Sequence, residues 1–198
     1  MFAFAVGQCC CACTDCCNGA YANEWDVDAS FGSSTCASSP FCNFATGTFT
    51  LQKITGAGCK WLYEYLNPEN ILDGPDCAAY SPWYLDSLSY ELSINCINDT
   101  QYGVTLTVRL SAQRRLDCIG GTTSYMSTLD TITYTAIVNV AEFDCEAAAD
   151  FEVTKTSHVT DYFGASCAVQ EFGFISRPTW ILGPLCSSPS TITITAVS

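Results

Sequence analysis

Six of the fifteen cysteines lie within nine consecutive positions. They are Cys9, Cys10, Cys11, Cys13, Cys16 and Cys17. Two overlapping C-x-x-C spacings, Cys10 with Cys13 and Cys13 with Cys16, could supply thiolates to a metal. A structural zinc site needs four ligands, usually from two such pairs, and Cys36 and Cys42 are too far apart to form the second pair. We interpret the cluster as a disulfide knot and expect no cofactor; zinc, an iron–sulfur cluster and palmitoylation are the alternatives.

The other cysteines are spread along the chain, about one for each predicted hairpin, as expected for disulfides that cross-link β-structure. They are Cys36, Cys42, Cys59, Cys77, Cys96, Cys118, Cys145, Cys167 and Cys186. Their positions suggest three pairings: Cys59 with Cys77, Cys96 with Cys118, and Cys145 with Cys167. Sequence does not determine disulfide connectivity, so these pairings are hypotheses. The odd total leaves at least one cysteine unpaired within the chain or bonded to another chain.

Signals for catalysis are weak. The single histidine, His158, precedes Asp161 by three residues, but no nucleophile motif accompanies them. Three acidic pairs could bind calcium or hydrolyse glycosides, although their spacing is equally typical of solvated surface charge. These pairs are Asp26 and Asp28, Asp73 and Asp76, and Asp144 and Glu146. We expect no enzyme; a hydrolase is the weakest of three hypotheses.

Aromatic residues are the better indication of a binding surface. They concentrate between residues 61 and 84, where loop aromatics could contact a sugar ring or a protein partner. The alternating residues Trp61, Tyr63 and Tyr65 are interpreted instead as one face of the core. The candidates for partner or glycan contact are Trp83, Tyr84, Tyr80 and Trp25.

The charge balance excludes some partners. Seven basic and twenty acidic residues give a net charge of −13, so the chain lacks the basic surface that binds nucleic acid. The N-terminal MFAFAVGQ is too short for a Sec signal core, and no apolar run is long enough for a membrane helix. We therefore expect a protein made in a host cytoplasm, without membrane insertion. Its many cysteines then favour release by lysis, as for virion components, with export by another route to an extracellular location as the alternative.

Alternation of apolar and polar residues predicts an all-β fold. The alternation is clearest at Leu88 to Ile97, Gly103 to Ser111, Asp130 to Val140 and the C-terminal TITITAVS. The first two runs flank INDTQYG and are predicted to form a long hairpin. Weaker strand candidates are Thr48 to Ile54, Trp61 to Leu66, Phe151 to Lys155 and Gly173 to Ile175, and one short helix is predicted near 141 to 151. We expect an antiparallel β-sandwich, jelly-roll or Ig-like, at residues 47–198, preceded by a Cys-rich irregular arm at residues 1–46.

Four short motifs give the chain a resemblance to a group of Cys-rich β proteins encoded by tailed bacteriophages and planctomycete-like bacteria. They are the CC-x-C of Cys10, Cys11 and Cys13, the GTFTL of Gly47 to Leu51, the CKW of Cys59 to Trp61, and the TITIT of 191 to 195. The resemblance implies an association with virion structural genes and no catalytic residues. We therefore expect a structural virion component, in the tail, baseplate, fibre or capsid decoration, that binds other virion subunits as a homo-oligomer and contacts host glycans. The alternative is a secreted or surface disulfide-rich carbohydrate-binding module.

Overall fold

The computed structural model describes residues 23–31, 45–57, 59–66, 83–98, 100–117, 123–139, 150–163 and 189–197. These residues form eight strands. In chain order the strands are β1 (Glu24–Ala29), β2 (Gly47–Lys53), β3 (Lys60–Leu66), β4 (Trp83–Asn98), β5 (Gln101–Asp117), β6 (Thr123–Asn139), β7 (Phe151–Phe163) and β8 (Thr191–Ala196). The helix predicted near 141–151 lies mostly outside this description, although its last residue, Phe151, begins β7; the strand predicted at 173–175 lies wholly outside it.

The alternating pattern of the sequence corresponds to the two faces of each strand. In β5 every second residue from Tyr102 to Leu110 is buried, and the residues between them are partly exposed. In β4 the same alternation runs from Leu88 to Ile94. The predicted hairpin is confirmed, because β4 and β5 pair antiparallel up to Asn98 opposite Gln101. A period of two therefore assigned the inward face of the long strands correctly.

The sheet closes into a barrel, so the predicted β-sandwich is wrong. Each strand pairs antiparallel with the next along the chain, and β1 pairs with β8 to complete the circuit. The closing register places Val27 opposite Ile194 and Trp25 opposite Ala196. A sandwich strand and a barrel strand both have one wet face and one buried face, so alternation does not distinguish the two architectures. The connections also run up and down, unlike the Greek-key connections of jelly-roll and Ig-like folds.

Strand β1 lies inside the segment predicted to be an irregular arm. Its residues EWDVDA alternate with Trp25, Val27 and Ala29 buried, and the strand hydrogen-bonds to both β2 and β8. The barrel therefore includes residues 24–29, and the predicted boundary at residue 46 cuts off one of its strands. The strand was not predicted because the alternation in β1 covers only six residues. The residues at its outward positions are acidic, as is common in turn-rich segments.

Aromatic side chains fill the barrel interior. Trp25 packs edge-on against Trp61, with ring centroids 6.1 Å apart, and against Phe151 at 5.3 Å. Phe49 stacks on Tyr90 at 4.4 Å. The Tyr90 hydroxyl donates to the carbonyl oxygen of Ala45 at 2.6 Å, which satisfies a buried polar group. Burial, with smaller contributions from neighbouring tyrosines, raises the pKa of the Tyr90 phenol well above its ordinary value.

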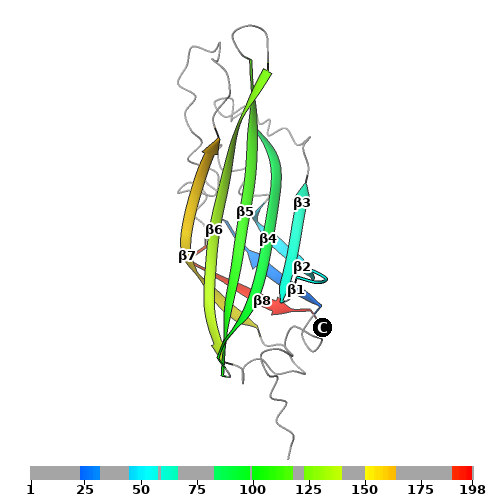
Figure 1. Cartoon of the computed structure of the whole chain (residues 1–198), viewed down its shortest axis with the longest axis vertical. Helices are drawn as coiled ribbons and strands as arrows, with labels where there is room; N and C mark the ends of the chain where they lie inside the picture. Colours follow the sequence, from blue (N-terminus) through cyan, green and yellow to red (C-terminus); the bar gives the residue numbers. More distant parts are fainter. Residues whose placement is uncertain are drawn as a thin grey trace, which may run out of the picture.

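The strands differ in length, and this difference shapes one end of the molecule. Strands β4, β5 and β6 have 16, 17 and 17 residues, whereas β1, β2, β3 and β8 have six or seven. Figure 1 shows β1, β2 and β8 crossing the lower half of the molecule, while the long strands and β7 continue above them. Beyond the short stretch that pairs with β8, β6 is the only described strand that pairs with β7.

Candidate interaction site on strand β7

Strand β7 has one edge that no described residue pairs with along most of its length. Strand β8 pairs with β7 only from Phe151 to Thr154, and the N–H of Lys155 donates to Ser190 O at 2.9 Å just beyond. From Thr156 to Phe163 the strand pairs with β6 on one side, and the described structure places no strand on the other. Eight residues of strand span about 27 Å. Edge strands carry a row of backbone donors and acceptors that can bind another strand.

Residues along this edge are exposed on both faces of the strand. All residues from Thr154 to Val159 are exposed, in contrast to the half-buried alternation of β5. Val159 and Phe163 are 52% and 55% exposed, although both are large and apolar. Opposite Val159 and Phe163 in β6 lie Thr131 and Ser127, so both apolar side chains belong to the outer face. An exposed edge with apolar side chains is typical of a surface that associates.

A buried carboxylate ties this part of β7 to β6. Asp130 of β6 is completely buried, and it is the only charged residue with that burial among the described ones. Its Oδ1 atom accepts a hydrogen bond from Nε2 of His158 at 3.0 Å and another from the hydroxyl of Thr160. Because an ionised carboxylate only accepts, Nε2 of His158 carries the hydrogen in this contact. Asp130, His158 and Thr160 are called the β7 clamp below.

The clamp contains one unsatisfied atom. Oδ2 of Asp130 is buried and has no hydrogen-bond partner in the part of the chain that the structure describes. Burial raises the pKa of the Asp130 carboxyl above its ordinary value, although the hydrogen bonds from Thr160 and His158 and the charge of His158 partly oppose the rise. The clamp fixes β7 by side-chain contacts at the point where backbone pairing with β8 has ended.

A bulge separates the clamped part of β7 from the part inside the barrel. The register shifts between Thr133 and Tyr134, so Thr156 is an extra residue in β7, and its hydroxyl donates to Thr133 O at 3.2 Å. The shift keeps His158 on the inner face, opposite Ile132, and Thr160 opposite Asp130. If Thr156 instead paired regularly with Thr133, His158 would lie opposite Thr131 on the outer face, and the clamp would not form.

The β7 clamp was not predicted from the sequence, although the position of Asp130 could have indicated it. The sequence pattern associates His158 with Asp161, but Asp161 lies opposite Leu129 and is exposed. The partner is Asp130, which lies on the inward face of β6 together with Ile132 and Tyr134. A charged residue on the inward face of a strand needs a buried partner. The alternating pattern of the sequence already places Asp130 on that face.

The predicted contact aromatics do not gather into one described surface. Trp25 is 0% exposed in the barrel core, so its side chain has no surface with which to contact a glycan. Trp83 and Tyr84 begin β4, opposite Arg114 and Gln113, but their side chains lie outside the description. Tyr80 also lies outside the described residues.

Two of the fifteen cysteines are described, Cys59 and Cys96, and both are disulfide-bonded. Cys59 precedes β3 and is buried, whereas Cys96 lies near the end of β4 and is exposed. The remaining cysteines lie outside the description, so the proposed pairings and the N-terminal knot stay predictions.

Ionic contacts on the outer surface connect β3, β4 and β5. Glu91 accepts from Lys60 at 3.2 Å and from Arg109 at 3.1 Å. Burial tends to raise the pKa of Glu91, but the hydrogen bonds from Arg109 and Lys60 outweigh it and lower the pKa. Among the described residues, no group of three or more His, Cys, Asp or Glu side chains is placed to hold a metal ion. No described helix has the length and apolar character needed to cross a membrane.

Comparison with known proteins gave no relative. No protein-family model matches the chain, and no curated protein or solved structure matches it. The resemblance to phage and planctomycete proteins and the virion assignment therefore stay predictions from the sequence.

Proposed function

We propose that the chain is a non-catalytic structural subunit that assembles with a second copy of itself through the outer edge of β7. The observation that carries the proposal is the run from Thr156 to Phe163, which is paired on one edge only in the described structure. Its residues as far as Val159 are exposed on both faces of the strand. Two such edges related by a two-fold axis would form one continuous sheet across two barrels.

Exposed apolar side chains on the outer face of β7 favour the contact. Val159 and Phe163, about half exposed in the single chain, become covered on the outer face of the joined sheet. Burial of such side chains is the main source of free energy in association.

The β7 clamp prepares the edge for pairing. Asp130 holds both His158 and Thr160, so the strand keeps an extended conformation although β8 no longer supports it. A strand that is already ordered loses less conformational entropy on binding than a flexible segment does. The buried carboxylate thus has a structural role that requires no catalysis.

The test is the mass of the native, oxidised protein by light scattering and sedimentation, from low to high micromolar concentration. We expect a concentration-dependent species of at least twice the chain mass of 21.4 kDa. Val159→Lys places a charge at the exposed edge and should prevent the pairing. Leu66→Lys, at a residue of β3 that is 65% exposed, is the matched control.

Hydrogen exchange adds a readout for backbone pairing. The amides of Thr156 to Phe163 that point away from β6 should become protected as concentration rises, and Val159→Lys should abolish that protection. A chain that stays at 21.4 kDa at every concentration would overturn the proposal. Association that Leu66→Lys abolishes and Val159→Lys leaves intact would overturn it as well, because the contact would then involve β3.

A further inference from the structure

The β7 clamp brings together three groups that can form a covalent bond between β6 and β7. The hydroxyl of Thr160 donates to Oδ1 of Asp130, which places the hydroxyl oxygen next to the carboxyl carbon. Nε2 of His158 lies 3.0 Å from the same Oδ1 atom. A hydroxyl, a carboxyl and an imidazole in mutual contact are the groups that acyl transfer requires. Their arrangement does not depend on the proposed pairing of the β7 edge.

Burial prepares the Asp130 carboxyl for attack by the hydroxyl. The side chain is 0% exposed, and Oδ2 has no hydrogen-bond partner among the described residues. Burial disfavours the charged form and raises the pKa of this carboxyl above its ordinary value. A neutral acid is a better target for a nucleophile than a carboxylate ion, because it carries no negative charge and its protonated oxygen can leave as water. The hydrogen of the neutral acid belongs on Oδ2, because Oδ1 already accepts two hydrogen bonds.

We propose that Thr160 and Asp130 react to form an ester that links β7 to β6. The Thr160 oxygen adds to the carboxyl carbon, and its hydrogen passes along the existing hydrogen bond to Oδ1. The N–H of His158 Nε2 stabilises the negative charge that develops on Oδ1. Oδ2 then leaves as water with its own hydrogen and the hydrogen that came from Thr160, and Oδ1 remains as the carbonyl oxygen of the ester. The reaction consumes no co-reactant, and one water molecule is its only by-product.

The fold favours the ester over its hydrolysis. Two groups held in contact react as if they were highly concentrated, with effective molarities of roughly 10⁵ M or more in well-oriented cases, far above the concentration of water itself. Burial also keeps bulk water away from the Asp130 side chain. The reaction must follow folding, because β6 and β7 have to pair before Thr160 lies opposite Asp130. Freshly folded chains therefore hold the free, titratable carboxyl, and the linked fraction rises with time.

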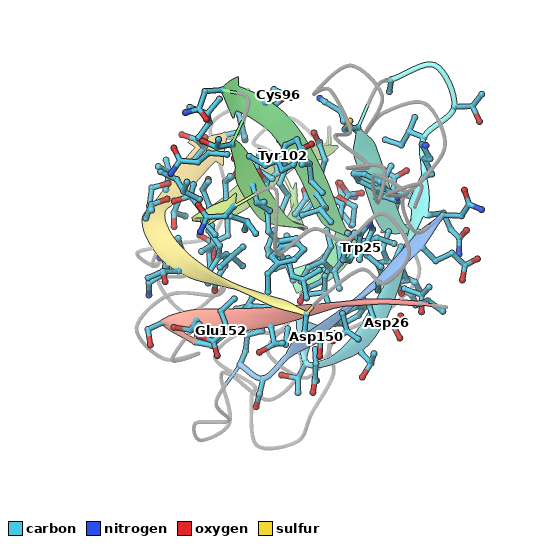
Figure 2. The ribbon with its side chains drawn as sticks, turned by 90° about the horizontal axis from the view of Figure 1, so that it is seen from below. Trp25, Asp26, Cys96, Tyr102, Asp150 and Glu152 are labelled. Atoms are coloured by element: carbon cyan, nitrogen blue, oxygen red, sulfur yellow. The ribbon has the colours of Figure 1, made fainter. Side chains whose placement is uncertain are left out.

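The position of the ester suits a structural cross-link. Figure 2 shows β7 (yellow) beginning beside β8 (red) near Asp150 and then curving away from it. Backbone pairing with β8 ends at Thr154, so a bond at Thr160 ties the part of β7 beyond β8 to β6. In the unfolded chain the same bond closes a loop between Asp130 and Thr160, and it restricts that state as a disulfide does.

Tryptic digestion and mass spectrometry test the proposal directly. Lys155 lies between Asp130 and Thr160, so cleavage after it places the two residues in separate peptides, 116–155 and one that begins at Thr156. Samples of the native, oxidised protein are taken from fresh to aged, then denatured, fully reduced, alkylated and digested near neutral pH. We expect the two peptides to appear joined, lighter than their sum by one water, in a share that grows with age. Alkaline hydroxylamine should separate them and leave a hydroxamate at Asp130, because it cleaves esters.

Three variants of β7 identify the reacting hydroxyl. Thr160→Val removes it and should abolish the joined peptides, whereas Thr160→Ser keeps a hydroxyl and should retain them. Thr154→Val, at an exposed threonine of the same strand, is the matched control and should behave as the wild type. Separate peptides from the wild type at every age would overturn the proposal. Joined peptides that persist in Thr160→Val, or that resist alkaline hydroxylamine, would overturn it too. The mass of the native assembly tests the β7 pairing separately, so either proposal can fail without the other.

Discussion

The substitution Asp130→Asn tests whether burial dominates the electrostatics of the β7 clamp. The asparagine side chain keeps an oxygen that accepts from His158 and Thr160, and its amide nitrogen takes the place of the unpartnered Oδ2. A protonated aspartic acid has the same shape, with one accepting oxygen and one donor. At low pH, where Asp130 is protonated, the free energies of unfolding of the two proteins should therefore agree within about 1 kcal/mol.

The pH dependence follows from the direction of the pKa shift. The Asp130 pKa is raised above its ordinary value of 3.8, so the carboxyl contributes stability that is fully present below 3.8. That contribution is lost as pH rises from 3.8 through the folded-state pKa. One carboxyl changes the unfolding free energy by at most about 1.4 kcal/mol per pH unit. Asparagine does not titrate, so the variant should become more stable than the wild type as pH rises.

The assay is urea unfolding of both proteins from about pH 3 to pH 8, with intact disulfides. His158 contacts Asp130 and can also titrate, so the same pair is compared in a His158→Gln background. Asp161→Asn, at an exposed acid on the same strand, controls for the loss of a surface charge. If the wild type instead gains stability over the variant as pH rises, the hydrogen bonds outweigh burial and the assigned direction is wrong.

Three further predictions concern the barrel itself. Leu106→Ala empties a completely buried position in β5 and should lower the unfolding free energy by about 3 to 5 kcal/mol, measured by urea unfolding. Gly103→Ala should be neutral or stabilising, because Ile97 can move, whereas Gly56→Ala, at a φ of +80°, should cost about 1 kcal/mol; thermal melts compare the two. Reduction of the disulfides should lower the unfolding free energy by about 2 to 5 kcal/mol for each bond lost, and an unchanged melting temperature would contradict their role.

Much of the local structure could be predicted from the sequence. The alternation at Leu88 to Ile97 and at Gly103 to Ser111 identified the faces of β4 and β5, and the turn residues between them identified the hairpin. Cys96 departs from this pattern. It occupies an inward position of the alternation, but it is exposed near the end of β4. These features are local, since a strand with one buried face must place every second side chain inward.

The candidate site was much less predictable. His158 and Asp130 are 28 residues apart in sequence and meet only because β6 and β7 pair in one register. The bulge at Thr156 then decides which face His158 occupies. Register and bulges depend on contacts between strands, and a single-strand pattern does not contain them.

Composition and alternation predict an all-β chain that is acidic and rich in cysteine, with strands whose inward residues form a core. The arrangement of the strands in space establishes that the sheet closes, because closure depends on the pairing of β1 with β8 from opposite ends of the chain. It also decided which described edge stays open, because β8 reaches only Thr154 of the longer β7. Side-chain periodicity is set within a strand, whereas closure and edges are set by the relative lengths and order of all the strands.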